Sequence, residues 1–361
     1  MYTLIIINTY SQLIIAIHMK RTILKSERVS ILITDFAKDS YLYSKNIQKQ
    51  GIFEKVYYIE AKKYCPEPQS FIEKWRSIKW IIFGNRVFNQ IEEKHWDKLL
   101  FYNTDTSTYC IYVKLAKQNP NIICCMYEEG IMSYSVPFSY NKRYEIVDII
   151  LKQIGIQGLE KNTKDFLCFY PTYYTGKLKA RIIPRISTSD QELINIITAT
   201  FEVDPIKNNH IYNKRYIYFS GVYDFEGGKP IGELNLVEKI SEIVGKENLI
   251  VKVHPRDNEE RFKRRGLNVA ESSNIPWEAI QMTSSLKNVT FLTALSGSVL
   301  LTNMIVTEPI KSVFLFSECD LTNNKAALRN ANDIKSIIDN GIDGKHLSWL
   351  SAPKTELEKL L

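Results

Sequence analysis

The sequence predicts an α/β protein built from two domains with parallel sheets. Its 361 residues are too many for one comfortable core, and they suit two domains of roughly 150–180 residues each. Short apolar, β-branched runs alternate with longer amphipathic segments in both halves, which is typical of parallel sheets covered by helices. Hydrophobic residues make up 45% of the chain, with only 15 glycines and 12 prolines, so extended disorder and low-complexity linkers are excluded.

The first half contains five short apolar runs that we expect to be strands. They are Leu4–Ile7, Val29–Thr34, Val56–Ile59, Lys98–Tyr102 and Ile122–Tyr127. Amphipathic spacing predicts helices between them at Gln12–Leu24, Ser40–Gln50, Pro68–Ser77 and Thr108–Gln118. Residues 135–185 are less regular and rich in Tyr, Phe and Pro, and we expect them to form an inserted or connecting region.

The second half repeats the same alternation. Ser187 to Asp190 is expected to cap a helix that runs to about Phe201. Strands are expected at Tyr216–Ser220, Leu249–His254, Val289–Leu292 and Ser312–Phe316, and helices near 231–244, 277–285, 298–305 and Pro353–Leu361. We therefore predict an N-terminal domain at 1–185 and a C-terminal domain at 186–361.

The charge balance favours an anionic partner. Lys and Arg number 47 against 40 Asp and Glu, a net charge of +7, although on charge alone a mildly basic protein without such a partner is the simpler explanation. The densest basic clusters, Arg261 to Arg265 and Lys177 to Arg185, are short and lie outside any recognisable nucleic-acid module, so no nucleic-acid partner is expected. The six cysteines show no CxxC spacing, which favours free buried thiols over zinc or disulfides.

The N-terminal residues do not predict a signal peptide. Met1 to Ala16 is apolar but interrupted by polar residues, and it lacks both a basic leading region and a small-residue cleavage site. No run approaches the roughly 18–20 apolar residues that a membrane-spanning helix needs. We expect a cytoplasmic protein, compatible with a peripheral contact at the inner face of the membrane.

A His-Pro pair follows the apolar run Leu249–Val253. Because proline ends a strand, His254 and Pro255 are expected at the carboxyl edge of the sheet, where open α/β sheets bind ligands. An imidazole there can donate to a phosphate oxygen or protonate a leaving group. The alternative is a strand-end histidine that bonds only to the backbone.

Two adjacent carboxylates follow another expected strand, in the sequence Glu128-Glu129-Gly130. Successive side chains on extended backbone point in opposite directions, so one carboxylate can face a ligand while the other braces it. A carboxylate near apolar walls has a raised pKa and can act as a general base. A solvated turn after a strand is the alternative.

A third motif, Ser296-Gly297-Ser298, lies between an expected strand and an apolar helix. Backbone N–H groups and hydroxyls at such a helix start can hold a phosphate, although an ordinary N-cap is the alternative. Ser220 and Gly221 follow the first strand of this half, near Asp224. Glu278 is expected in the first turn of a helix, where it either complements the helix dipole or binds ribose hydroxyls.

Several familiar cofactor motifs are absent. The chain has no GxxxxGK[ST] loop, no GxGxxG fingerprint, no HExxH and no Asp-x-Asp of the kind that holds a divalent metal on a sugar nucleotide. We therefore expect neither a metal nor a cofactor. Two Rossmann-like domains with parallel sheets facing a cleft would be the architecture of a GT-B glycosyltransferase.

Taken together, these motifs resemble the bacterial sialyltransferases, which share an acidic-acidic-Gly motif, a His-Pro motif and a downstream serine motif. The opening Asn8-Thr9-Tyr10-Ser11-Gln12 is also similar to the Asn-Thr-x-x-Gln start of glycosyltransferase family 52, which includes lipooligosaccharide and capsule α-2,3-sialyltransferases. The motifs occur in matching order from residue 4 to about residue 316.

The resemblance implies a metal-independent, inverting enzyme that uses CMP-sialic acid, bound mainly by the C-terminal domain. It implies that His254 is the general acid or the phosphate donor, that Ser296 and Ser298 hold the phosphate with Gly297, and that Glu278, Ser220 and Gly221 hold ribose and base. Lys252 and Pro255 complete the expected donor site.

The resemblance leaves three candidates for the general base. The acidic motif points to Glu128 or Glu129, whereas the lipooligosaccharide branch uses an aspartate upstream of His-Pro, for which Asp224 is the nearest match.

The implied acceptor is a terminal galactose of a capsular polysaccharide or lipooligosaccharide, and family relatives form homodimers. Two other functions remain open from the residues. One is a GT-B transferase of another sugar, such as glucose, in cell-surface polysaccharide synthesis. The other is a non-catalytic protein that binds nucleotides or polyanions, which would explain the positive charge but leave the strand-end motifs without a purpose.

Overall fold

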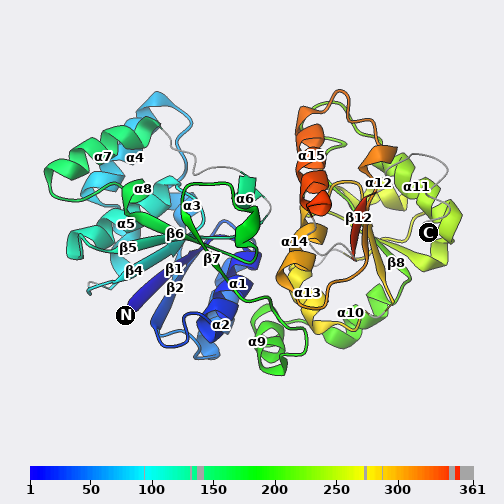
Figure 1. Ribbon diagram of the computed structural model, residues 1–361, viewed down its shortest axis with the longest axis horizontal. Helices are drawn as coiled ribbons and strands as arrows, with labels where there is room; N and C mark the ends of the chain where they lie inside the picture. Colours follow the sequence, from blue (N-terminus) through cyan, green and yellow to red (C-terminus); the bar gives the residue numbers. More distant parts are fainter. Residues whose placement is uncertain are drawn as a thin grey trace. The chain divides into compact units, whose positions relative to one another are not determined.

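The computed structural model describes residues 1–92, 94–130, 132–135, 142–271, 275–286, 288–340 and 346–349. The chain folds into two compact units, each with its own parallel sheet and covering helices (Figure 1). The first unit comprises Met1–Pro184 and Asn195–Phe201, and the second comprises Arg185–Ile194 and the residues from Glu202 on. The expected helix at Pro353–Leu361 lies outside the described residues.

The described part of the first unit contains a seven-stranded sheet in the order β3-β2-β1-β4-β5-β6-β7. Neighbouring strands are parallel, and Ile5 of β1 lies opposite Ile31 of β2 and Leu100 of β4. These three side chains are fully buried, as a sheet covered on both faces requires. The strands are β1 Tyr2–Ile7, β2 Arg28–Thr34, β3 Val56–Ile59, β4 Lys98–Phe101, β5 Ile123–Tyr127, β6 Thr163–Cys168 and β7 Lys179–Ile182.

The expectation that residues 135–185 merely connect two domains is wrong. They add β6 and β7 to the first sheet, where β6 pairs in parallel with β5 and β7 pairs in parallel with β6. The sequence did not predict β7, because this edge strand is mostly exposed and has no apolar run. The aromatic residues of the region pack on the sheet, where Phe166 contacts the rings of Tyr134 and Tyr174.

Helices of the first unit begin at well-defined caps. Thr9 caps α1, Asp105 caps α5, and Ser70 with Glu73 forms a capping box that starts α4 later than expected. The described helices are α1 Tyr10–Arg21, α2 Ser40–Lys49, α3 Ala61–Tyr64, α4 Phe71–Phe83, α5 Thr106–Gln118, α6 Met132–Ser135, α7 Lys142–Gln153 and α8 Leu159–Asn162.

The second unit has a five-stranded parallel sheet in the described residues, in the order β12-β11-β10-β8-β9. Its strands are β8 Tyr216–Phe219, β9 Leu249–Lys252, β10 Thr290–Thr293, β11 Ser312–Phe314 and β12 Leu347–Trp349. Its helices are α10 Pro205–Tyr212, α11 Glu233–Val244, α12 Glu259–Lys263, α13 Trp277–Thr283, α14 Gly297–Ile305 and α15 Lys325–Asp339. Helix α9, Gln191–Phe201, begins in the second unit and ends in the first.

The strand order places a topological switch point in the second sheet. From β8 the chain first adds β9 on one side and then β10 on the other. Ligands of open α/β sheets bind beside such a switch, at the carboxyl ends of the strands. The segments after β8, β9 and β10 therefore form the edge at which a ligand is expected, and they contain the serine, His-Pro and Ser-Gly-Ser motifs.

The sequence predicted free, buried cysteines and no membrane-spanning helix. All six cysteines are free thiols and five of them are buried, as the absence of a CxxC spacing predicted. Within the ranges given above, none of the helices has the length and apolar character needed to cross a membrane.

Asn324 fixes the loop that follows β8, and its replacement should destabilise the second unit. This fully buried side chain donates to the carbonyl groups of Tyr223, Glu226 and Lys229 at 3.0, 2.9 and 3.1 Å, and its Oδ1 accepts the N–H of Ala327 at 3.0 Å. Asn324→Ala leaves these groups unpaired, so we expect a loss of about 3 kcal/mol in the free energy of unfolding, measured with urea.

Asn340→Ala serves as the control, because Asn340 is an exposed residue that follows α15. We expect a change within about 0.5 kcal/mol. Equal losses for the two variants would contradict the anchoring role of Asn324.

Candidate active site

His254 is held at the carboxyl edge of the second sheet by its backbone. Its N–H donates to Ser220 Oγ at 2.9 Å, and its carbonyl accepts the N–H of Asp257 at 2.8 Å. The Ser220 hydroxyl in turn donates to Asp257 Oδ2 at 3.2 Å. Because Ser220 follows β8 and His254 follows β9, one hydroxyl ties the ends of two neighbouring strands together.

The ring of His254 presents Nε2 as its donor. The N–H of Arg256 donates to Nδ1 at 3.1 Å, so Nδ1 acts as an acceptor and the neutral ring carries its proton on Nε2. Burial, and then the charge of Arg256, lowers the pKa of His254 below its usual value. At neutral pH the side chain is therefore a hydrogen-bond donor rather than a cation.

The residues that follow β8 form hydrogen bonds within the second unit. The N–H of Gly221 donates to both carboxylate oxygens of Glu233, at 2.9 and 3.1 Å. Glu233 is fully buried and also accepts from the hydroxyl of Tyr218 at 3.1 Å. Burial raises the pKa of Glu233 to about 7. Ser220 and Gly221 thus shape the edge, and their hydroxyl and N–H groups already have partners.

One guanidinium connects these carboxylates. Arg261 bonds Asp257 at 2.7 Å, Asp224 at 2.6 Å and Glu233 at 3.3 Å. The three carboxylate side chains are 10% exposed or less, so the shared cation offsets a large desolvation cost. The sequence suggested only a short basic cluster at 261–265; the i,i+4 spacing of Asp257 and Arg261 was the one available signal of a buried pair.

Asp224, a candidate general base, occupies a structural position. Its Oδ1 accepts the N–H groups of Gly232 and Glu233 at 3.0 and 3.1 Å, and its Oδ2 bonds Arg261. These contacts cap the start of α11. They give Asp224 a role in the fold that needs no substrate, and its part in catalysis stays a prediction.

The start of α14 leaves its backbone N–H groups uncapped by side chains. Ser296 is the N-cap residue, yet its hydroxyl makes no capping hydrogen bond. Gly297 is exposed, and a Cβ built there would meet nothing within 4 Å. An open helix N-terminus beside the switch point is suited to an anion. Ser298, in the first turn, is half-buried.

Lys252 adds a cation to the same edge. It is the last residue of β9, and burial lowers the pKa of its ammonium group, whereas the charge of Glu278 opposes that change. Glu278 is itself buried, at the start of α13, and the neighbouring Trp277 packs edge-on against Phe219 and Phe291. Pro255 is exposed beside His254.

The two carboxylates of the acidic motif differ in their surroundings, at the carboxyl end of β5 in the first unit. Glu128 is fully buried; its Oε2 accepts the Phe169 N–H at 2.9 Å and the Tyr134 hydroxyl, while its Oε1 has no hydrogen-bond partner. Burial raises the pKa of Glu128 to about 7. Glu129 is half-buried beside the Tyr102 hydroxyl, whose pKa is raised to about 12, first by burial and then by Glu129.

The residues of the opening Asn-Thr-x-x-Gln motif form structural hydrogen bonds at the switch point of the first sheet, where β2 and β4 lie on either side of β1. Thr9 Oγ1 caps α1, and Gln12 Oε1 accepts the N–H of Asn8 at 2.6 Å. The Asn8 side chain accepts from Thr34 at 2.8 Å and donates to Asn103 at 3.4 Å. The motif therefore joins the ends of β1, β2 and β4.

The structure thus brings Ser220, Gly221, Lys252, His254 and the start of α14 to one edge of the second sheet. Glu128 and Glu129 lie at the carboxyl edge of the first sheet. The sequence did not reveal Arg261, Asp257, Glu233 or Tyr134. Only the i,i+4 spacing of Asp257 and Arg261 could have indicated a contact, because the other contacts join residues that are farther apart in sequence.

Comparison with solved structures confirms the α/β, GT-B-like fold class. S. aureus MnaA with UDP is 11% identical, with 99% of this chain and 86% of that chain covered at a TM-score of 0.50. A sialyltransferase from Photobacterium damsela is 13% identical (97% and 81% covered, TM-score 0.49), and Acinetobacter baumannii MurG is 11% identical (99% and 88%, TM-score 0.45). No curated protein matches the sequence.

The chain is a glycosyltransferase of the sialyltransferase class. Residues 3–313 match the model of the alpha-2,8-polysialyltransferase family, and the chain belongs to that family. The expected class is thereby confirmed, whereas the particular assignment to family 52, with α-2,3 linkage, is not the one that matches.

Replacing Arg261 should destabilise the second unit strongly. Arg261→Met leaves three buried carboxylates without their cation, and we expect a loss of about 3–5 kcal/mol in the free energy of unfolding. Arg261→Lys keeps the charge but cannot reach all three carboxylates, so an intermediate loss is expected. Urea unfolding measures both variants.

Arg265→Lys is the matched control, because Arg265 pairs with the half-buried Glu238 and is itself 51% exposed. Its effect should stay within about 0.5 kcal/mol. If Arg261→Lys is equally mild, the guanidinium does not organise this edge.

Glu128 should make stability fall as the pH rises. Its raised pKa means that the folded chain keeps this proton, so the stabilisation is full below the unfolded pKa near 4.5 and is lost as the pH passes about 7. Glu128→Gln removes the titration. Between about pH 5 and about pH 8, the stability of the variant should therefore rise relative to wild type by about 3 kcal/mol.

Urea unfolding at several pH values measures the difference, and Glu54→Gln, at an exposed glutamate, provides the control. A difference between wild type and Glu128→Gln that does not vary with pH would show that Glu128 is ionised throughout this range.

Proposed function

We propose that the protein transfers sialic acid from CMP-sialic acid to a glycan hydroxyl, with inversion at the anomeric carbon and without a metal ion. The observation that carries this proposal is the carboxyl edge of β9, β8 and β10, which combines a neutral imidazole donor, a lysine and an open helix N-terminus. These groups suit a single phosphate on a leaving nucleotide. Family membership supports sialic acid as the sugar.

In the proposed reaction, the acceptor hydroxyl oxygen attacks the anomeric carbon as the bond from that carbon to the CMP phosphate oxygen breaks. The departing electron pair stays on the phosphate. Donation from His254 Nε2, the charge of Lys252 and the N–H groups of Gly297 and Ser298 stabilise this charge. Ser296, Glu278 and Pro255 complete the donor site in this proposal.

We assign the general base to Glu129. A base must reach the acceptor, and Glu129 is half-buried, whereas Glu128 is inaccessible and binds Tyr134 and Phe169. Glu129 would take the proton of the acceptor hydroxyl on the face opposite to CMP, which produces inversion. Glu128 then acts as a positioning residue that fixes the backbone of the motif.

The acceptor has two candidates. The family description supports a terminal sialic acid, extended through an α-2,8 linkage. The motif resemblance pointed to a terminal galactose of a capsular polysaccharide or lipooligosaccharide, joined through an α-2,3 linkage. Both acceptors place a sugar hydroxyl beside the base, so the chemistry proposed above is the same for either. A bacterial, cytoplasmic setting belongs to the same proposal.

The decisive experiment is the release of CMP from CMP-N-acetylneuraminic acid in EDTA, with lactose, a short α-2,8-linked oligosialic acid or no acceptor. We expect acceptor-dependent release. Glu129→Gln should reduce kcat by about 10²–10⁴-fold, and Glu128→Gln by less. His254→Ala should reduce turnover while CMP still binds, as measured by calorimetry.

His95→Ala is the control, because His95 lies on the surface with a 65% exposed side chain. Full activity of His254→Ala would contradict the phosphate site. An absence of release with every acceptor would favour a different nucleotide sugar, or a protein that binds nucleotides without catalysis.

A further inference from the structure

Helix α4 presents large apolar side chains to solvent. Phe71 and Ile72 are each 73% exposed, Trp75 is 50% exposed and Phe83 is 80% exposed. Contiguous exposed apolar surface of this kind marks an interaction site on a soluble protein. The proposed transfer reaction does not use these residues.

The exposed residues share one face of the helix. At about 100° per residue, Phe71, Trp75, Ile72 and Phe83 fall within roughly 120° around the axis. Lys79 lies inside that stripe and Arg76 at its border. Ile78, at the edge of the stripe beside Phe71, and Ile81, farther round the helix, are buried in the core of the first unit. The outer face of α4 is therefore both apolar and cationic.

The surrounding segment has a marked excess of positive over negative charge. Residues 61–90 hold Lys62, Lys63, Lys74, Arg76, Lys79 and Arg86 against Glu67 and Glu73, a net +4 of the total +7. Both carboxylates are engaged within the fold. Glu73 accepts the N–H groups of Gln69 and Ser70, and Glu67 accepts that of Thr106. Both carboxylates also lie on the surface, so the segment presents an excess of cations rather than cations alone.

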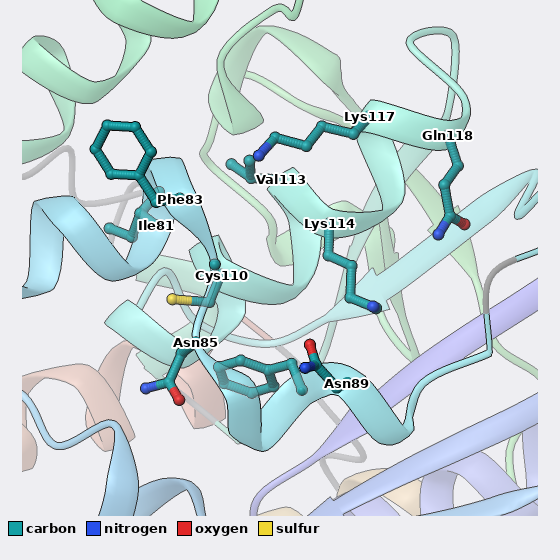
Figure 2. A pocket seen from close by; sticks show the side chains of 11 residues that line it. Ile81, Phe83, Asn85, Asn89, Cys110, Val113, Lys114, Lys117 and Gln118 are labelled. Carbon is teal, nitrogen blue, oxygen red and sulfur yellow. The ribbon is translucent and has the colours of Figure 1, made fainter.

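A pocket of about 320 Å³ adjoins the end of this helix (Figure 2). Phe83 and Asn85 form one wall, and Lys114 and Lys117 of α5 line the other. Lys117 donates to the carbonyl of Ile82 at 2.8 Å, which fixes α5 to the end of α4. Aromatic and ammonium groups therefore also lie close together beyond the end of α4, around this pocket.

The neighbouring helix α7 widens the apolar surface. It packs beside α4 (Figure 1) and exposes Ile146 by 45% and Ile149 by 62%. The first unit therefore presents two adjacent helices with apolar side chains to solvent.

We propose that the outer face of α4 binds the surface of a membrane that contains anionic lipids. Aromatic and aliphatic side chains would enter the boundary between headgroups and acyl chains, and the lysines and arginines would contact lipid phosphates. A second copy of this chain fits less well, because a two-fold contact through α4 would place the same cationic face against itself.

The test is flotation of the full-length protein with vesicles, either of phosphatidylcholine alone or of phosphatidylcholine and phosphatidylglycerol in equal parts. Wild type should float only with the anionic vesicles. Trp75→Ser and Phe83→Ser should each weaken binding about ten-fold. Lys79→Gln should weaken it about five-fold, the equivalent of about 1 kcal/mol per charge.

Two controls remove an exposed apolar side chain and an exposed charge elsewhere on the protein. Ile206→Ser removes an apolar side chain that is 83% exposed on α10, and Lys49→Gln removes an exposed charge at the end of α2. Both should float as wild type does. All variants should release CMP at the wild-type rate with a soluble acceptor, which separates this proposal from the proposed function.

Three outcomes would overturn the proposal. Wild type could fail to float, or float equally with neutral vesicles. The controls could lose binding as much as the α4 variants do. Finally, sedimentation velocity could show a dimer that Phe83→Ser converts to a monomer, which would make this face an interface between two copies.

Discussion

The guanidinium of Arg261 holds the carboxyl edge of the second sheet together. Through Asp257 it positions the hydroxyl of Ser220, which accepts the backbone N–H of His254. Through Glu233 it supports the carboxylate that binds the N–H of Gly221. The position of the His254 imidazole therefore depends on Arg261, which does not itself need to contact a substrate. Three nearly buried carboxylates would repel one another without this cation, so geometry and charge balance depend on the same residue.

The two adjacent glutamates of the acidic motif, Glu128 and Glu129, have different properties because the backbone points their side chains in opposite directions. Burial makes Glu128 hard to ionise and surrounds it with a phenol and a peptide N–H, whereas Glu129 stays within reach of solvent. Adjacent residues on extended backbone necessarily face opposite ways. The geometry therefore makes one carboxylate a buried brace and leaves the other accessible.

Much of the fold could be predicted from the sequence, because buried parallel strands consist of uninterrupted apolar runs such as that of β1. The exposed edge strand β7 has no such run and was missed, as was β12. At the candidate site, His254 and Glu129 could be found because each follows a buried strand. Arg261 could not, since its three partners are as many as 37 residues away in sequence and a basic cluster suggests surface rather than interior.

Helix α9 has a consequence for recombination between relatives. Its first residues group with the second unit and its last residues, from Asn195 on, with the first. Ile186 is bonded to Ile305, whereas the carbonyl of Thr200 accepts from Asn46. The polypeptide therefore passes between the units three times rather than once. A chimera made at any single breakpoint would place a short segment from one parent in the unit of the other. Exchange of a whole unit between homologues therefore requires residues 185–194 to come with the second unit and residues 195–201 to come with the first.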